Sequence, residues 1–77
     1  MQKGLYKHYK GNYYAVLYVG RDSETLEEVV VYQAQHGEHE VWVRPKKMFQ
    51  QNVEIEHETV ARFTFISANI PETNAAL

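Results

Sequence analysis

The chain has 77 residues with a net charge of −2, and none of them is cysteine. A chain of this length forms one domain that buries only about 60 to 65% of its unfolded surface, which excludes a deep active-site cleft. Without cysteine there are neither disulfides nor thiolate metal sites. No apolar run approaches the roughly 20 residues that cross a bilayer, and the first residues lack a signal-peptide core. We therefore expect a soluble, cytoplasmic protein with no membrane partner.

Residues 4–20 predict an aromatic hairpin, which holds five of the six tyrosines of the chain. Residues 4–9 and 13–19 are both rich in strand formers. They meet at Lys10-Gly11-Asn12, where Gly11 and Asn12 tolerate the positive φ angles of a tight turn. We expect the later elements to cover the apolar face of this hairpin.

The middle of the chain predicts a second pair of strands. Turn formers and caps interrupt the pattern over residues 21–28, and we expect Leu26 to tuck beneath this loop as a plug. Residues 29–34 begin with three consecutive valines, which indicates a central strand covered on both faces. A turn at residues 36–38 then leads into an antiparallel strand at residues 40–44.

The C-terminal part predicts one helical turn and two more strands. Pro45 has no amide hydrogen for a ladder, so it ends the preceding strand and starts a short helical turn near residues 45–50. Residues 53–56 alternate, with Val53 and Ile55 facing inward. Residues 57–59 form a bend and residues 60–66 the last strand. Residues 67–77 carry little apolar surface, which predicts a flexible tail.

Together these elements predict a single all-β domain over residues 1–66. Five or six short strands without an amphipathic helix favour a small antiparallel SH3-like barrel or a rolled sheet, and the barrel is the first choice. Closing the sheet would remove its exposed edges, which matters because the valine-rich strand is prone to aggregate. An open sheet that dimerises through its edge is the alternative.

Charge is segregated along the chain. Residues 1–21 carry four bases and no acid, whereas residues 22–43 carry six acids and no base. Arg44, Lys46 and Lys47 form a second basic block. The net acidity argues against a global attraction to nucleic acid. A local basic face forms if the hairpin and this block fold together; alternatively, opposite charges on neighbouring strands simply pair across the sheet.

Several segments of the sequence resemble DUF1653, a family of small bacterial domains. They are Gly4-Leu5-Tyr6-Lys7-His8-Tyr9-Lys10-Gly11 with Tyr14 and Val16, Ser23-Glu24-Thr25-Leu26-Glu27-Glu28, Val30-Val31-Tyr32, Trp42-Val43-Arg44-Pro45, Met48-Phe49 and Arg62-Phe63. The resemblance extends from residue 4 to about residue 66, in the family's order and spacing. It implies a domain of unknown function with no catalytic residues to carry over. The family usually has histidine immediately before the Ser-Glu-Thr run, where this chain has Asp22.

The resemblance draws attention to eight polar and aromatic residues as candidate ligand-binding residues: Tyr6, His8, Lys10, Ser23, Glu24, Tyr32, Trp42 and Arg44. In one interpretation Val41 and Val43 fill the core. Trp42 and Arg44 then face outward, where they stack on bases or hold a carboxylate or phosphate. In the other interpretation Trp42 is a core residue, and Arg44 extends along its ring to an acid such as Glu24.

The sequence gives little support to a catalytic or metal site. His8, Ser23 and Glu24 are a base, a nucleophile and a carboxylate, but no nucleophile elbow surrounds Ser23 and nothing in the spacing brings the three together. Residues 36–40 hold two histidines and two glutamates without His-Glu-x-x-His spacing, so a solvated turn is the better interpretation. We expect no metal, no cofactor and no catalytic residue.

The sequence therefore favours a small binding or adaptor module that recognises a protein or peptide through an aromatic and basic groove. The first alternative is a module for single-stranded nucleic acid, since Tyr6-Lys7-His8-Tyr9-Lys10 interleaves aromatic and basic residues. The second is a small enzyme that uses His8, Ser23, Glu24 and Arg44. Whether the module acts alone or as a homodimer is open.

Overall fold

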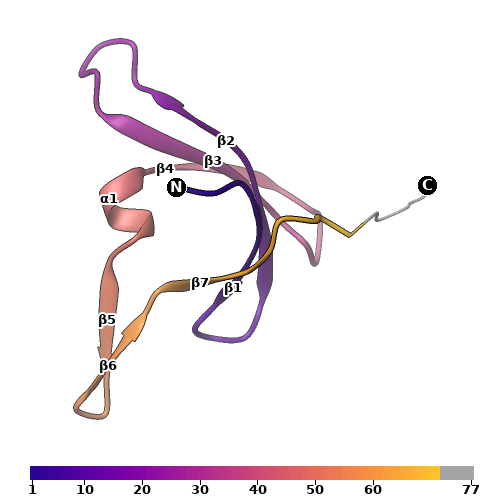
Figure 1. Cartoon of the computed structure of the whole chain (residues 1–77), viewed down its shortest axis with the longest axis vertical. Helices are drawn as coiled ribbons and strands as arrows, with labels where there is room; N and C mark the ends of the chain where they lie inside the picture. Colours follow the sequence, from indigo (N-terminus) through magenta and orange to yellow (C-terminus); the bar gives the residue numbers. More distant parts are fainter. Residues whose placement is uncertain (72–77) are drawn as a thin grey trace.

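The computed structural model of the chain describes residues 1–71, which form seven strands and one short helix (Figure 1). In chain order the elements are β1 Gly4–His8, β2 Tyr13–Arg21, β3 Glu28–Ala34, β4 Val41–Pro45, α1 Lys46–Phe49, β5 Asn52–Ile55, β6 Glu58–Ala61 and β7 Phe63–Ser67. The predicted all-β class and the helical turn after Pro45 are confirmed. The predicted tail begins at the last residue of β7, and its residues 72–77 lie outside the described part of the chain.

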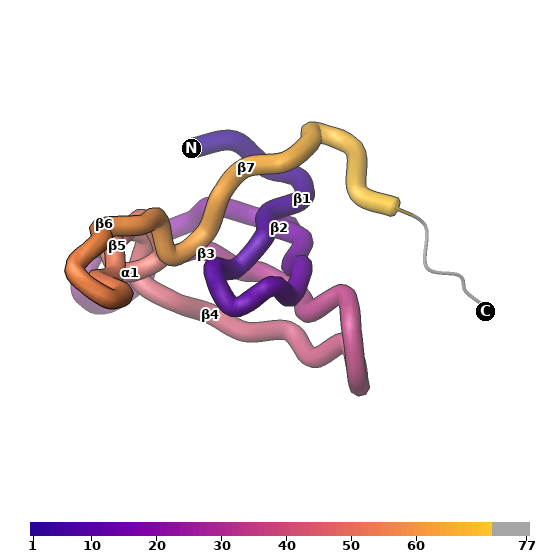
Figure 2. The backbone as a smooth tube through the Cα atoms, turned by 90° about the horizontal axis from the view of Figure 1, so that it is seen from below, coloured from indigo at the N-terminus to yellow at the C-terminus, as the bar shows by residue number. Residues whose placement is uncertain are grey.

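Five strands form one antiparallel sheet in the order β4-β3-β2-β1-β7, and β5 pairs only with β6. Strands β4 and β7 lie at opposite ends of the curved sheet (Figure 2). A closed barrel would require the β4 and β7 edges to pair directly or through another strand, but the two edges do not pair, and β5 and β6 project away as a separate hairpin (Figure 1). The sheet is therefore rolled and open: of the two predicted architectures, the rolled sheet is confirmed and the closed barrel is not formed.

One face of the sheet carries the hydrophobic core, and we call it the core face. Residues directly opposite one another on neighbouring strands point to the same face. The core residues come from β1, β2, β3, α1 and β7: Tyr6, Val16, Val30, Tyr32, Phe49 and Phe63. Phe49 of α1 is only 1% exposed, and its ring stacks on that of Phe63 with centroids 4.0 Å apart. One short helix thus covers one end of the core face.

The last predicted strand is interrupted at Arg62. Its backbone N–H donates to the carbonyl of Gln51, and its own carbonyl accepts from the N–H of Tyr9. One bond extends the β5–β6 pairing and the other extends the β1–β7 pairing, so at Arg62 the chain passes from the hairpin to a new strand beside β1. The prediction of one strand over residues 60–66 is therefore wrong.

The β5–β6 hairpin turns one residue earlier than predicted. Glu56 and His57 both have positive φ angles, 49° and 70°, as in a two-residue hairpin turn of type I′. Ile55 lies beside this turn and is exposed rather than inward-facing, because the hairpin projects from the core (Figure 1). Val53 and Ile55 do alternate with polar residues, but no core lies under the hairpin at Ile55 to bury its side chain.

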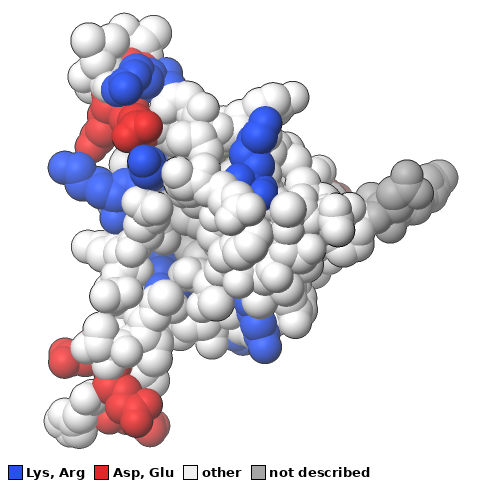
Figure 3. Space-filling view, viewed as in Figure 1, with Lys and Arg blue, Asp and Glu red and all other residues white. Residues whose placement is uncertain are grey.

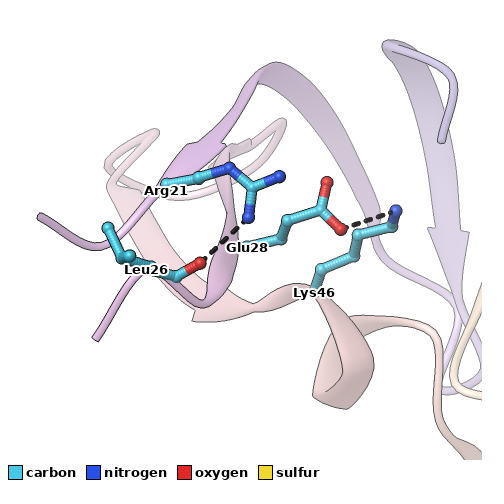
Figure 4. Close-up of polar contacts among 4 residues, drawn as sticks. All are labelled: Arg21, Leu26, Glu28 and Lys46. Atoms are coloured by element: carbon cyan, nitrogen blue, oxygen red, sulfur yellow. Dashed lines mark hydrogen bonds and ion pairs between the residues drawn. The ribbon is translucent and has the colours of Figure 1, made fainter.

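The β2–β3 loop is held by hydrogen bonds and not by a hydrophobic plug. The carboxylate of Asp22 accepts the backbone N–H groups of Glu24 and Thr25 at 2.8 and 3.1 Å. The guanidinium of Arg21 donates to the carbonyl of Leu26 at 2.9 Å (Figure 4). The Leu26 side chain is 65% exposed, with φ at 64°. The expectation that Leu26 tucks under the loop is therefore wrong.

Candidate binding groove

An open groove of about 520 Å³ occupies the part of the core face that α1 leaves uncovered. Its aromatic walls are Tyr14, Tyr32, Trp42 and Phe63. Its polar residues are His8, His36, Glu38, Glu40 and Arg44. We call it the β4 groove, because edge strand β4 forms one of its sides. Its lining residues come from all five strands of the sheet, so it exists only when the sheet has rolled.

Four of the eight candidate residues line this groove: His8, Tyr32, Trp42 and Arg44. Of the others, Tyr6 is buried in the core, where burial raises the pKa of its phenol. Lys10 lies in the β1–β2 turn, and Ser23 and Glu24 lie in the β2–β3 loop. The groove thus gathers four of the five candidate residues that lie on strands and none of those in loops.

Trp42 and Arg44 lie on the core face, because Trp42 is opposite Tyr32 and Arg44 is opposite Val30 in the β3–β4 ladder. Trp42 nevertheless remains 47% exposed, as a wall of the groove. Val41 and Val43 point to the opposite face, where they are 54% and 64% exposed. The first interpretation had these valines filling the core, and that part is wrong. The second placed Trp42 on the correct face but did not foresee its exposure.

The guanidinium of Arg44 is positioned by a tyrosine rather than by an acid. Its Nε donates to the Tyr32 hydroxyl at 3.2 Å. Among residues 1–71 no carboxylate lies within 4 Å of it, so the expected contact with Glu24 is not formed. A guanidinium has five N–H donors in a planar fork that suits a carboxylate or phosphate. Arg44 therefore presents donors that can hold an anionic group.

His8 lines the groove, and the backbone of the β1–β2 turn orients its ring. Its Nδ1 accepts the backbone N–H of Lys10 at 3.1 Å, so the ring proton resides on Nε2. Burial lowers the pKa of His8, and the charges of Arg62, Lys10 and Arg44 lower it further. The Phe63 ring packs edge-on against the imidazole, with centroids 4.9 Å apart. Arg44 thus supplies a permanent positive charge to the groove, and the Nε2–H of His8 is a hydrogen-bond donor.

The turn after β3 adds two carboxylates to the groove. His36, Glu38 and Glu40 line it together, and the Glu40 carbonyl accepts the N–H of Ala34 at 2.9 Å. Within the residues that the structure describes, no three His, Asp or Glu side chains are arranged to hold a metal ion. The groove is therefore of mixed charge, with Arg44 facing an acidic turn.

Ser23 and Glu24 are exposed in the β2–β3 loop and do not line the β4 groove. The two backbone N–H groups that bond Asp22 also lower the pKa of its carboxyl. Asp22 thus organises the loop at the position where the family usually has histidine. Of the four residues considered for an enzyme, only His8 and Arg44 share a cavity.

On the face shown in Figure 3, acidic side chains lie away from the middle of the molecule. Acidic residues cluster at the two projecting hairpin ends, at the β2–β3 loop and the β5–β6 turn (Figure 3). Near the first cluster, the Lys46 ammonium lies 3.3 Å from the Glu28 carboxylate (Figure 4). The face between the hairpins is mostly uncharged, with isolated lysines and arginines (Figure 3). No helix in the described part of the chain is long and apolar enough to cross a membrane.

Sequence reasoning missed several lining residues, including Tyr14, Ala34 and Phe63. Their signal was alternation: Tyr14 lies two residues before the core residue Val16, and Ala34 two residues after Tyr32. Alternation alone did not show that Tyr14 and Ala34 lie on the part of the core face that α1 leaves uncovered. Phe63 reaches the groove only because β7 pairs with β1, a pairing that local sequence does not specify.

Comparison with known proteins agrees with this fold. The sequence profile described as "Protein of unknown function (DUF1653)" matches residues 4–65. A crystal structure of a protein belonging to DUF1653 from Bordetella bronchiseptica superposes with a TM-score of 0.81 at 30% identity, covering 94% of this chain and 95% of that one. None of the curated proteins compared with the chain matches it. Since the profile spans nearly the whole described domain, the chain belongs to the DUF1653 family.

Proposed function

We propose that the chain is a cytoplasmic binding module whose β4 groove holds an extended segment of a partner protein. The observation that carries this proposal is Arg44, which Tyr32 positions in an aromatic groove with no carboxylate partner among residues 1–71. Trp42, two residues earlier on β4, leaves about half of its surface exposed beside it. Ligand sites commonly combine such apolar walls with a few polar groups that fix orientation.

Trp42 and Arg44 together suggest the chemistry of the partner's extended segment. Side chains of an extended peptide alternate, so every second one faces the same side. A segment that runs along β4 can therefore place an aromatic side chain on Trp42 and, two positions away, a carboxylate on Arg44. Glu38 and Glu40 disfavour a polyphosphate backbone, which is why a peptide ranks above single-stranded nucleic acid.

An NMR titration of the isotope-labelled protein tests this proposal. The probes are short peptides with an aromatic residue two positions from an aspartate, the same peptides with asparagine in place of aspartate, and short single-stranded RNA and DNA. We expect saturable shifts at the Trp42 indole and at Arg44 with the aspartate peptides and weaker binding with the asparagine peptides. Saturable shifts with RNA or DNA alone would replace the peptide by nucleic acid, and no shifts with any probe would overturn the proposal.

Tyr18→Ala is the matched control for changes at Trp42. Tyr18 is also an exposed aromatic, but it lies on the opposite face of the sheet, where it pairs with Val31. Binding through the β4 groove predicts that Tyr18→Ala keeps its affinity for the aspartate peptides. Equal losses in Tyr18→Ala and Trp42→Ala would contradict a specific groove.

A further inference from the structure

Strand β4 is an open edge of the sheet. It pairs with β3 on one side only, and in Figure 2 no other segment lies beyond it. Its middle residues Val41, Trp42 and Val43 are all about half exposed or more. Charged or bulged edge strands discourage pairing with other chains. This edge is extended and apolar at its centre, so it offers a surface on which another strand can pair.

The hydrogen-bond pattern shows which backbone groups face outward. The N–H of Ala34 donates to the carbonyl of Glu40, so these two residues form a hydrogen-bonded pair of the ladder. Such pairs alternate along an antiparallel ladder. Trp42 and Arg44 therefore also direct their backbone groups toward β3. The N–H and C=O groups of Val41 and Val43 point away from the sheet.

We propose that two copies of this chain dimerise by antiparallel pairing of their β4 strands, with the twofold axis at Trp42. In this register Val41 lies opposite Val43 of the second copy, and by symmetry the reverse holds. Each of these two pairs exchanges two hydrogen bonds, which satisfies all four outward groups on each strand. The pairing is isologous, as most homodimers are. It would join two five-stranded sheets into one continuous sheet.

Charge selects this register. Pairing about Trp42 places Glu40 opposite Arg44 of the second copy, once on each side of the axis. Neither side chain has an ion-pair partner within residues 1–71 of its own chain. Both line the same face as Trp42, so the two charges and the ring stand in one row. Opposite charges on directly opposed residues stabilise an antiparallel pair, and like charges destabilise it.

Backbone geometry disfavours the neighbouring registers. A shift in one direction brings Val41 opposite Pro45 of the second copy, which has no N–H to donate. A shift in the other direction brings Val43 opposite His39, whose φ of 56° is not that of a strand. A pairing of one short strand buries less than the roughly 1,200 Å² of stable interfaces, so we expect a weak, concentration-dependent dimer.

Charge-reversed variants test this proposal by sedimentation of the peptide-free protein from about 10 μM to about 1 mM. Glu40→Arg alone and Arg44→Glu alone each place like charges opposite one another, so we expect each to weaken dimerisation at least about tenfold. A mixture of the two variants restores both attractive pairs, and we expect heterodimers close to wild-type strength. Absence of a wild-type dimer at the highest concentration, or a mixture no stronger than its components, would overturn the proposal.

Val43→Pro tests whether backbone hydrogen bonds between the two β4 strands hold the dimer together. It removes an outward N–H without taking a hydrogen bond from the β3–β4 ladder, whereas Val43→Thr keeps the N–H and a β-branched side chain. We expect loss of the dimer in Val43→Pro and its retention in Val43→Thr, with both variants folded by NMR. A dimer that persists in Val43→Pro would refute edge pairing. The variant also leaves every groove side chain in place, so peptide binding is measured on it independently of dimerisation.

Discussion

The two halves of the core face belong to the same strands but differ in what covers them. Toward the start of β3, Val30 is fully buried in a cluster that includes Phe49 of α1. Toward the end of β3 and the start of β4, Trp42 is 47% exposed and the face is a groove. Tyr32 stands at the boundary, with its ring near Phe49 and its hydroxyl bonded to Arg44.

This difference shows that a core and a binding surface can be made from one alternating pattern. The residues on both halves are large and mostly aromatic or branched, so composition does not separate them. The four-residue helix α1 separates the two halves, because it follows Pro45 directly and reaches only the half of the core face near the start of β3. The groove is thus the part of an aromatic core that the short helix cannot reach.

Phe49→Ala should uncover the half of the core face on which α1 packs. Removal of a buried phenylalanine costs about 3–5 kcal/mol of unfolding free energy, which is a large part of the stability of a domain this small. We expect a strongly lowered urea midpoint or an unfolded chain. The control is Met48→Ala, at the exposed neighbouring position of the same helix. Similar losses in both variants would show that helix formation, and not the Phe49 ring, covers the core.

The double variant Trp42→Ala, Arg44→Ala should reduce peptide binding in the open half of the core face and leave the fold largely intact. Trp42 is half exposed and Arg44 lies at the groove, so we expect a folded protein with a stability loss below about 1.5 kcal/mol. Peptide affinity should fall at least about tenfold, because an aromatic and an arginine anchor are both removed. Denaturation and NMR titration measure the two effects. Collapse of the fold would show that this pair is structural.

Tyr32→Phe sharpens the boundary between the halves. The change keeps the buried ring and removes the hydroxyl that accepts from Arg44, so we expect a loss of about 0.5–1.5 kcal/mol in stability. Peptide binding should weaken as well, since Arg44 is no longer held in place. Tyr14→Phe is the control, because the Tyr14 hydroxyl makes no hydrogen bond among the described residues. Equal effects in both variants would argue against a positioning role for Tyr32.

The smallest expected effect concerns the pH dependence of stability through His8. Burial lowers the pKa of His8 in the folded chain below the ordinary value of 6.5, so the unfolded chain protonates first as the pH falls. The contribution of His8 to stability is therefore complete above about pH 6.5 and is lost as the pH falls from there toward the folded-state pKa. His8→Phe should flatten this part of the profile measured by thermal unfolding. A profile that keeps its acid slope in His8→Phe would contradict this role of His8.

Local sequence determined much of the architecture of this chain. Strand formers around Gly11 predicted the first hairpin, and Pro45 predicted both the end of β4 and the helical turn, because each depends on backbone conformation within a few residues. Alternation correctly placed Trp42 and Arg44 on one shared face. The family assignment rested on the same local segments and is confirmed.

Only the tertiary structure decided which face is covered and how far. Alternation pairs residues on a face but does not say what packs on it, so the exposure of Trp42, Leu26 and Ile55 could not be read from the sequence. The break at Arg62 depends on backbone bonds to Gln51 and Tyr9, which are distant along the chain. The groove itself arises because β7 pairs with β1 while α1 covers only part of the core face, and both are long-range contacts.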